Sequence, residues 1–235
     1  MESLPHLLAA GQGQAALLTA LTMLGTFALI GGITLLILKR EAKRSARIGA
    51  LMMPRGFSFV PKPSPEEHSR ILGGFRLGQL GSGRTLTNLS AKLPDADEEV
   101  LLFESGFTQG SGKHSTTYRQ TVLRLTSARF HLPEFHLNPE TMLNRIGHAI
   151  GMQDIDFDAF PLFSKSYQLK GPDEAAIRSF FDASLLSALE RQPGLTIEGA
   201  GNQLLIYRMG KRRRPEEFQS FLEEGLLGVL FSRGP

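Results

Sequence analysis

Three carboxylates recur at alternate positions in the stretch DIDFD, namely Asp154, Asp156 and Asp158. In an extended backbone, alternate side chains lie on one face, so this spacing would direct the carboxylates to one side and the apolar residues between them inward. Oxygen donors of this kind suit a hard cation such as Ca²⁺ or Mg²⁺. The stretch is therefore a candidate metal site.

The known calcium-binding loop nevertheless does not fit here. Its central glycine is replaced by Ala159 and its last glutamate by Lys165, and both positions are essential to that loop. Charges that alternate with apolar residues usually mark an exposed face. We therefore favour a solvated face, helix capping, or ion pairs with Lys165 or Arg145, and predict no metal.

Three histidines, His131, His136 and His148, lie in the same part of the chain. Their spacing matches no zinc motif, and the chain has no Cys to complete one or to act as a thiol nucleophile. No G-x-S-x-G motif is present either. An enzyme, hydrolytic or metal-assisted, that uses carboxylates and histidines of residues 130–158 remains the alternative function, with catalytic residues unassigned and no cofactor predicted.

The segment Gly78 to Thr85, GQLGSGRT, comes within one residue of a phosphate-binding loop. Arg84 replaces the lysine that would reach the phosphates, and the residues that follow alternate like a strand where the motif requires a helix. This pattern predicts a glycine-rich turn that leads into a strand.

Two basic clusters could contact anionic lipid headgroups, since each basic residue near such a surface contributes about 1 kcal/mol. The first cluster, in LKREAKRSAR, and the second, in KRRR, comprise Lys39, Arg40, Lys43, Arg44, Arg47, Lys211, Arg212, Arg213 and Arg214. For the second cluster, a solvated loop is the preferred interpretation.

A long uncharged segment, residues 15–38, stands directly before the first basic cluster. A helix of this length is roughly 36 Å long, enough to cross a hydrocarbon core of about 30 Å. A cleaved signal peptide fits poorly, because residues 1–14 contain Glu2 and no Lys or Arg, the apolar run is too long, and a basic block follows it. We therefore predict a retained transmembrane helix that binds the lipid bilayer.

The distribution of charged residues along the chain predicts the orientation of this helix in the membrane. Of 26 basic and 23 acidic residues, the first 54 positions hold five basic residues and only Glu2 and Glu41 as acids. The remaining chain is formally neutral, which argues against nucleic acid as a partner. Basic flanks stay inside, so we predict a single-pass protein of the inner cell membrane with residues 1–14 outside and the C-terminal domain cytoplasmic.

Within the span, Ala28 and Gly32 form one pair of small residues four positions apart, which predicts weak homodimer formation through the anchor. Beyond residues 39–53, the basic juxtamembrane segment, prolines at 54, 61, 63 and 65 predict an extended spacer over residues 54–70. The soluble domain is then expected to occupy residues 71–235.

The soluble domain is predicted to be α+β, with a largely antiparallel sheet and about three helices. Alternating residues predict strands from Phe75 to Leu125, with a hairpin tip at TQGSGKH, and another hairpin through Gly199 to Asn202. Helices are predicted from Pro139, over GPDEAAIRSFFDASLLSALERQPG, and at PEEFQSFLEEGLLGVLFSR. Asn138 would cap the first of these helices.

Three runs of residues, LPEFHLNPE, DIDFDAFPLFSKSYQLKGPDEAAIRSFF and LTIEGAGNQLLIYR, resemble a family of uncharacterised bacterial membrane-anchored proteins. The resemblance covers roughly residues 98–224. It implies one domain of unknown function and a bacterial source, and it carries over no activity, cofactor or catalytic residue. With the anchor and no catalytic constellation, we expect a cytoplasmic binding or scaffolding domain with unidentified protein partners, rather than an enzyme.

Overall fold

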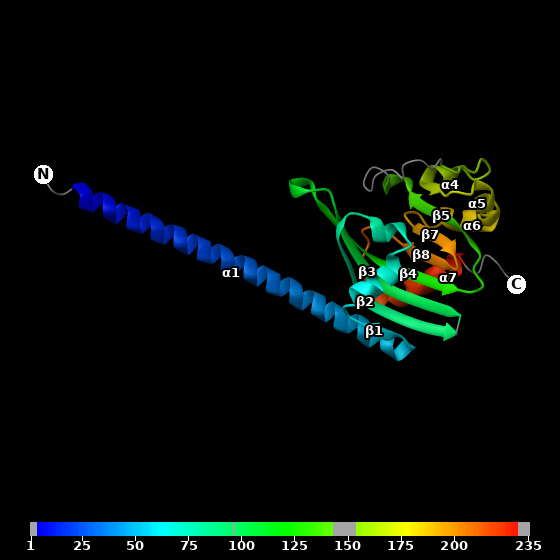
Figure 1. The fold of residues 1–235 in the computed structure, drawn as a ribbon, viewed down its shortest axis with the longest axis horizontal. Helices are drawn as coiled ribbons and strands as arrows, with labels where there is room; N and C mark the ends of the chain where they lie inside the picture. The colour runs from blue at the N-terminus through cyan, green and yellow to red at the C-terminus, as the bar shows by residue number, and fades with distance from the viewer. Residues whose placement is uncertain (1–3, 96, 143–153, 230–235) are drawn as a thin grey trace. The chain divides into compact units, whose positions relative to one another are not determined.

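A computed structural model describes residues 4–95, 97–142 and 154–229 of the 235-residue chain. The chain divides into two compact units, with the boundary between Ala46 and Arg47. The long helix α1, Leu4–Met52, forms the first unit as far as Ala46. Its remaining residues, from Arg47 to Met52, belong to the second unit. α1 is coloured blue to cyan in Figure 1.

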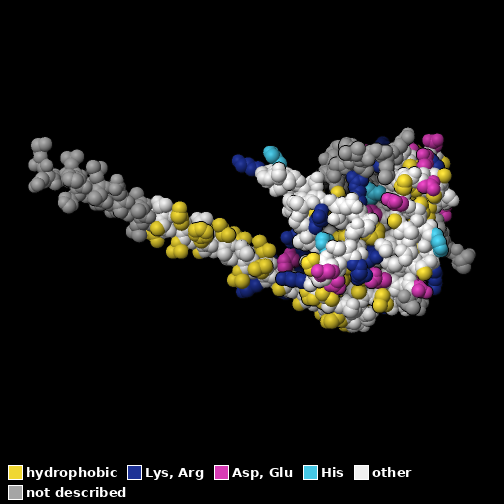
Figure 2. Space-filling view, viewed as in Figure 1, with side chains coloured by type: hydrophobic (Ala, Val, Ile, Leu, Met, Phe, Trp, Pro, Cys, Tyr) yellow, Lys and Arg dark blue, Asp and Glu magenta, His cyan; other side chains and the backbone are white. Residues whose placement is uncertain are grey.

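The described part of α1 is apolar on all sides in the predicted span. Its large apolar side chains, from Leu18 to Leu38, are exposed, as the hydrophobic side chains in Figure 2 show. By length and composition this helix can cross a membrane. The helix continues without a break to Met52, so the basic segment is helical over residues 39–52.

The second unit is built on one eight-stranded antiparallel sheet with the order β1-β2-β3-β4-β8-β7-β5-β6. The strands are β1 (Ser58–Val60), β2 (Ser82–Asp95), β3 (Glu98–Gln109), β4 (Thr116–Ser127), β5 (Leu132–Pro139), β6 (Tyr167–Lys170), β7 (Thr196–Gly201) and β8 (Gln203–Tyr207). The hairpin of β7 and β8 thus lies between β4 and β5, two strands that are consecutive in the sequence (Figure 1).

Short helices connect and cover the strands. The α-helices are α2 (Pro65–Leu72), α4 (Pro161–Ser166), α5 (Glu174–Phe180), α6 (Ala183–Glu190) and α7 (Phe218–Val229). The 3₁₀ helices are η1 (Met53–Arg55), η2 (Arg76–Gln79), η3 (Gly112–His114), η4 (Glu140–Met142) and η5 (Pro215–Glu217). The α+β class is confirmed, and the described part of the second unit holds five α-helices after α1 where the sequence predicts about three.

Each face of the sheet has its own apolar core. Alternate strand residues such as Leu137 and Ile197 pack with α4 to α7 and with Ile48 and Met52 from the last turn of α1. The opposite face, which includes Leu205, packs with α2 and η2. Burial on both faces explains why several strands read as continuous apolar runs.

Side-chain caps fix several of the short helices. Ser64 accepts a hydrogen bond from the backbone N–H of Glu67, and the Glu67 carboxylate accepts one from the backbone N–H of Ser64, so α2 starts with a capping box. Asp182 caps α6 in the same way by accepting from the N–H of Leu185. Because Asp182 starts a new helix, the single helix predicted over this region is two helices, α5 and α6.

Two local predictions were wrong. The region 54–70, predicted to be an extended spacer, contains β1 and α2, because Pro65 occupies the first turn of α2, where proline is favourable. The helix predicted from Pro139 does not start there: Asn138 and Pro139 end β5 and lie opposite Gln168 and Tyr167 of β6. The rest of that predicted helix lies largely outside the described residues.

Both predicted hairpins are confirmed. β3 and β4 pair along their whole length and enclose the glycine-containing tip, Gly110 to Ser115. β7 and β8 are joined through Gly201 and Asn202, since Ala200 lies opposite Gln203. Gly201 has a φ of 58°, a conformation that glycine adopts without strain.

Candidate functional site

Three ionisable residues form a row across neighbouring strands at one side of the sheet. His136 of β5 lies directly opposite Lys170 of β6 and, on its other side, directly opposite Glu198 of β7. Directly opposite residues in a sheet share a face. Because the next residues along these strands pack in the core with α4 to α7, the row faces the α2 and η2 side.

Glu198 holds η2 against the sheet. Its carboxylate is 4% exposed and accepts hydrogen bonds from the backbone N–H groups of Arg76 and Leu77 and from the hydroxyl of Tyr207. Burial raises the pKa of this carboxyl, and the hydrogen bonds act in the opposite direction. Since three donors already occupy Glu198, its main role is structural.

His136 is uncharged at neutral pH. Burial, together with the nearby cations Arg76 and Lys170, lowers the pKa of its imidazole to about 3. The ring Nε2 lies 2.6 Å from Nδ2 of Asn138, while the buried Nδ1 has no partner among the described residues.

A cavity of about 510 Å³ opens beside this row. One wall is η2 with the residues before it, and the other is formed by the adjoining parts of β5, β6 and β7. The lining residues are Gly74, Phe75, Arg76, Gln79, Leu80, Glu134, Phe135, His136, Lys170, Gly171, Pro172, Glu198, Gly199 and Ala200. A volume of this size lies within the range of small-molecule sites, about 300–1,000 Å³.

Gly199 lets the sheet pack closely beside the cavity. A Cβ atom at this position would lie 2.3 Å from the ring of Phe135, which is itself buried. No side chain fits at that distance without displacing the ring. This close packing makes glycine a structural requirement of β7.

The carboxylate of Asp154 binds backbone N–H groups. Its Oδ1 accepts hydrogen bonds from the backbone N–H of Ile155 and of Leu169, and the N–H of Ile155 donates to the carbonyl of Leu169. Asp154 therefore covers the outer edge of β6. Burial raises the pKa of the Asp154 carboxyl, partly offset by these hydrogen bonds.

The remaining residues of the predicted catalytic region do not assemble with it. Asp156 and Asp158 are exposed, and Arg178 donates to the backbone carbonyl of Asp156. His131 is exposed beside the carbonyl of Arg129, and His148 and Arg145 lie outside the described residues. In the described part of the chain, no group of three His, Asp or Glu residues could hold a metal ion.

The segment Gly78 to Thr85 is a turn into a strand, as predicted. It runs from the end of η2 into β2, so no helix follows the glycines. The Arg84 guanidinium donates to the carbonyls of Gln79 and Gly81 and stabilises the turn.

The arginines of the second basic cluster form ion pairs within the protein. Arg212 binds both carboxylate oxygens of the buried Glu104, at 2.9 and 2.6 Å, and Arg213 pairs with Glu224. Arg214 pairs with Glu217, while Lys211 is exposed. Three of the four basic residues that the sequence suggests as lipid contacts in this cluster therefore form ion pairs within the protein.

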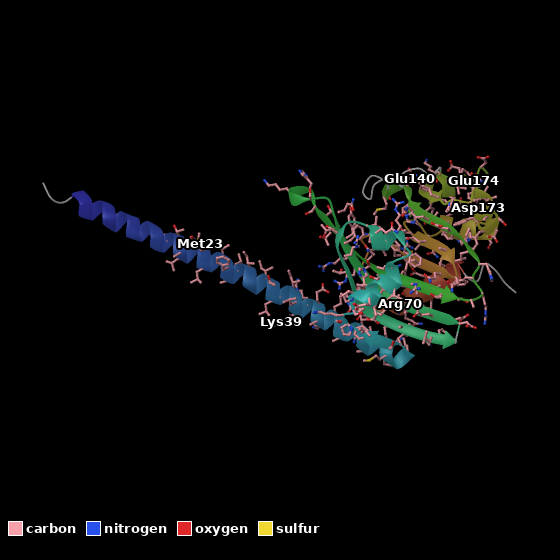
Figure 3. All side chains as sticks on the ribbon, viewed as in Figure 1. Met23, Lys39, Arg70, Glu140, Asp173 and Glu174 are labelled. Atoms are coloured by element: carbon pink, nitrogen blue, oxygen red, sulfur yellow. The ribbon has the colours of Figure 1, made fainter. Side chains whose placement is uncertain are left out.

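The first basic cluster differs from the second. Lys39, Arg40 and Lys43 are exposed on α1, and the side chain of Lys39 projects from the helix in Figure 3. Arg44 is half-buried. Arg47, which belongs to the second unit, pairs with Glu216 at 3.0 Å.

Sequence reasoning singled out His136 but missed Lys170, Glu198 and Arg76. The available signal was a single charged residue in an otherwise apolar or small-residue strand, as in YQLK and TIEGAG. Both Lys170 and Glu198 are buried, and buried charged residues usually have a specific role. The sequence pattern does not reveal that β6 and β7 both pair with β5.

The structure therefore defines an α+β protein with an N-terminal helix that could insert in a bilayer. Comparison of the chain with protein-family models, with curated proteins and with solved structures found no match. The resemblance to a bacterial membrane-anchored family thus remains a prediction.

Proposed function

We propose that this protein is a single-pass bacterial membrane protein whose cytoplasmic α+β body binds a small ligand in the cavity beside η2. The observation that carries the proposal is this cavity of about 510 Å³, which is bordered by the buried Lys170. A cation in a cavity lining is suited to bind a polar group of a ligand.

The proposed anchor is α1, with residues 1–14 outside the inner membrane and the body in the cytoplasm. The exposed residues Lys39, Arg40 and Lys43 support this orientation under the positive-inside rule. In the same geometry they contact anionic headgroups. The pair of Ala28 and Gly32 supports weak self-association of the anchor.

The orientation can be tested by cysteine labelling, because the chain contains no natural Cys. We expect a membrane-impermeant maleimide to label Glu2→Cys in intact cells but to label Lys113→Cys, at the exposed hairpin tip, only after the membrane is opened. Labelling of Lys113→Cys in intact cells would contradict the proposed orientation. The unsubstituted protein is the control for background labelling.

Ligand binding can be tested with three probes of similar size, benzamide, benzoate and benzylammonium, added to the full-length protein in detergent. We expect at least one probe to shift the amide NMR signals of Gly171, Gly199 and Ala200, which line the cavity. The signals of the hairpin tip should stay in place. If no probe shifts the cavity signals, the proposed function is wrong.

A blocking variant shows whether these shifts arise in the cavity. Ala200→Trp adds a large side chain on the cavity side of β7, where Ala200 is exposed. Ala183→Trp adds the same group at an exposed position on α6, which packs on the opposite face of the sheet. We expect only Ala200→Trp to abolish the shifts, with both variants melting close to the parent.

A further inference from the structure

Lys170 is a largely buried cation that makes no ion pair with a described residue, although its charge lowers the pKa of the nearby Asp154 carboxyl. Its side chain lines the cavity, the residue is 9% exposed, and it makes no hydrogen bond or ion pair with any described residue. Removing an ammonium group from water costs free energy unless acceptors replace the lost water. The Lys170 ammonium group, which makes no hydrogen bond with a described residue, would therefore gain an interaction from an acceptor in the cavity.

His136 provides a second donor at the same place. The Asn138 amide nitrogen, an obligate donor, lies 2.6 Å from Nε2 of His136, so Nε2 is the acceptor. An uncharged imidazole with an acceptor at Nε2 carries its proton at Nδ1. That Nδ1 is buried and has no acceptor among the described residues, so it can donate to the same acceptor as Lys170.

The other charged groups at the cavity do not supply this acceptor. The Glu198 carboxylate is already occupied by two backbone N–H groups and a hydroxyl. Glu134 is exposed, and no ion pair joins it to Lys170. Arg76 adds a second positive charge close enough to His136 to lower the pKa of its ring.

We infer that the cavity takes a ligand with an anionic group, a carboxylate or a phosphate, that accepts from Lys170 and His136. Phe75 and Leu80, also in the cavity lining, would contact a compact apolar part of the same ligand. This inference rests on the proposed function and specifies the ligand class of that site.

The test measures affinity by calorimetry on the full-length protein, with probes that differ in charge. Benzoate and phenyl phosphate carry the anionic group, benzamide is neutral, and benzylammonium is cationic. We expect either anion to bind at least 10-fold more tightly than benzamide and benzylammonium. The ratio of benzoate to phenyl phosphate affinity then distinguishes a carboxylate ligand from a phosphate ligand, and inorganic phosphate alone shows how much the apolar part contributes.

Lys170→Met separates this role from a structural one, because methionine keeps the length of the side chain without its charge. We expect this variant to lose at least 10-fold in affinity for the preferred anion while the ligand-free protein melts close to the parent. The matched control, Lys165→Met, alters an exposed lysine on α4 and should change neither quantity.

The outcomes distinguish the two proposals. If benzamide binds as tightly as the anions, or Lys170→Met retains the parent affinity, the inferred ligand class is wrong while the cavity remains a binding site. If no probe shifts the cavity signals, the proposed function fails as well. Loss of affinity together with a lower melting temperature in Lys170→Met would assign Lys170 a structural role and overturn the inference.

Discussion

Replacing Glu104 by alanine is expected to lower the free energy of unfolding by about 3 kcal/mol. Glu104 is 3% exposed and binds Arg212 through two hydrogen bonds, and Nδ2 of Asn88 donates to it at 2.7 Å. The substitution removes the Glu104 acceptor from the Arg212 guanidinium and the Asn88 amide. The Arg212 side chain is 22% exposed and can regain some water, which favours the lower end of the range for broken buried pairs.

Chemical denaturation of the full-length protein in detergent measures this effect. The control is Glu174→Ala, which removes an ion pair of nearly the same length, 2.7 against 2.6 Å, whose partners are 42% and 57% exposed. Solvent weakens such a pair, so we expect a loss below about 0.5 kcal/mol. Equal losses in the two variants would show that burial does not determine the strength of the Glu104 pair.

Replacing Phe163 by alanine is expected to have a similar or larger effect, about 3–5 kcal/mol. Phe163 is 0% exposed, and its ring lies 5.8 Å from Phe157, 5.5 Å from Tyr167 and 6.3 Å from Phe181, measured between centroids. The substitution removes the apolar transfer free energy and leaves a cavity among three rings. The core between α4, β6 and α6 should therefore loosen.

The neighbouring residue provides a matched control for this prediction. Leu162 precedes Phe163 on the same helix but is 66% exposed, so Leu162→Ala should change the free energy of unfolding by less than about 0.5 kcal/mol. Chemical denaturation curves of the two variants measure the difference, provided that the unfolding free energy of both falls with denaturant concentration at the same slope. A loss below 1 kcal/mol in Phe163→Ala would contradict the assigned core.

The sequence predicted the elements that depend on local patterns. The uncharged run of residues 15–38 predicted the long helix, because an apolar run of that length is typical of a membrane-spanning helix. Alternation and glycine predicted the two hairpins. In contrast, Asn138 and Pro139 suit either the start of a helix or the end of a strand, and pairing with β6 determined the outcome.

The candidate site could not be predicted, because it depends on contacts between distant segments. Lys170, His136 and Glu198 meet only because the hairpin of β7 and β8 lies between β4 and β5. No local pattern specifies that insertion. The ion pair of Arg212 could not be predicted for the same reason, since its acceptor, Glu104, lies 108 positions earlier in the sequence.

The hydrogen bonds of Asp154 have a consequence for contacts between copies of this protein. An open strand edge would let copies join into chains by continuing one another's sheet. At β6 that edge is already covered by Asp154 and Ile155, and at the other end β1 offers only three residues. Both edges of the sheet are thus poorly suited to edge-to-edge polymerisation.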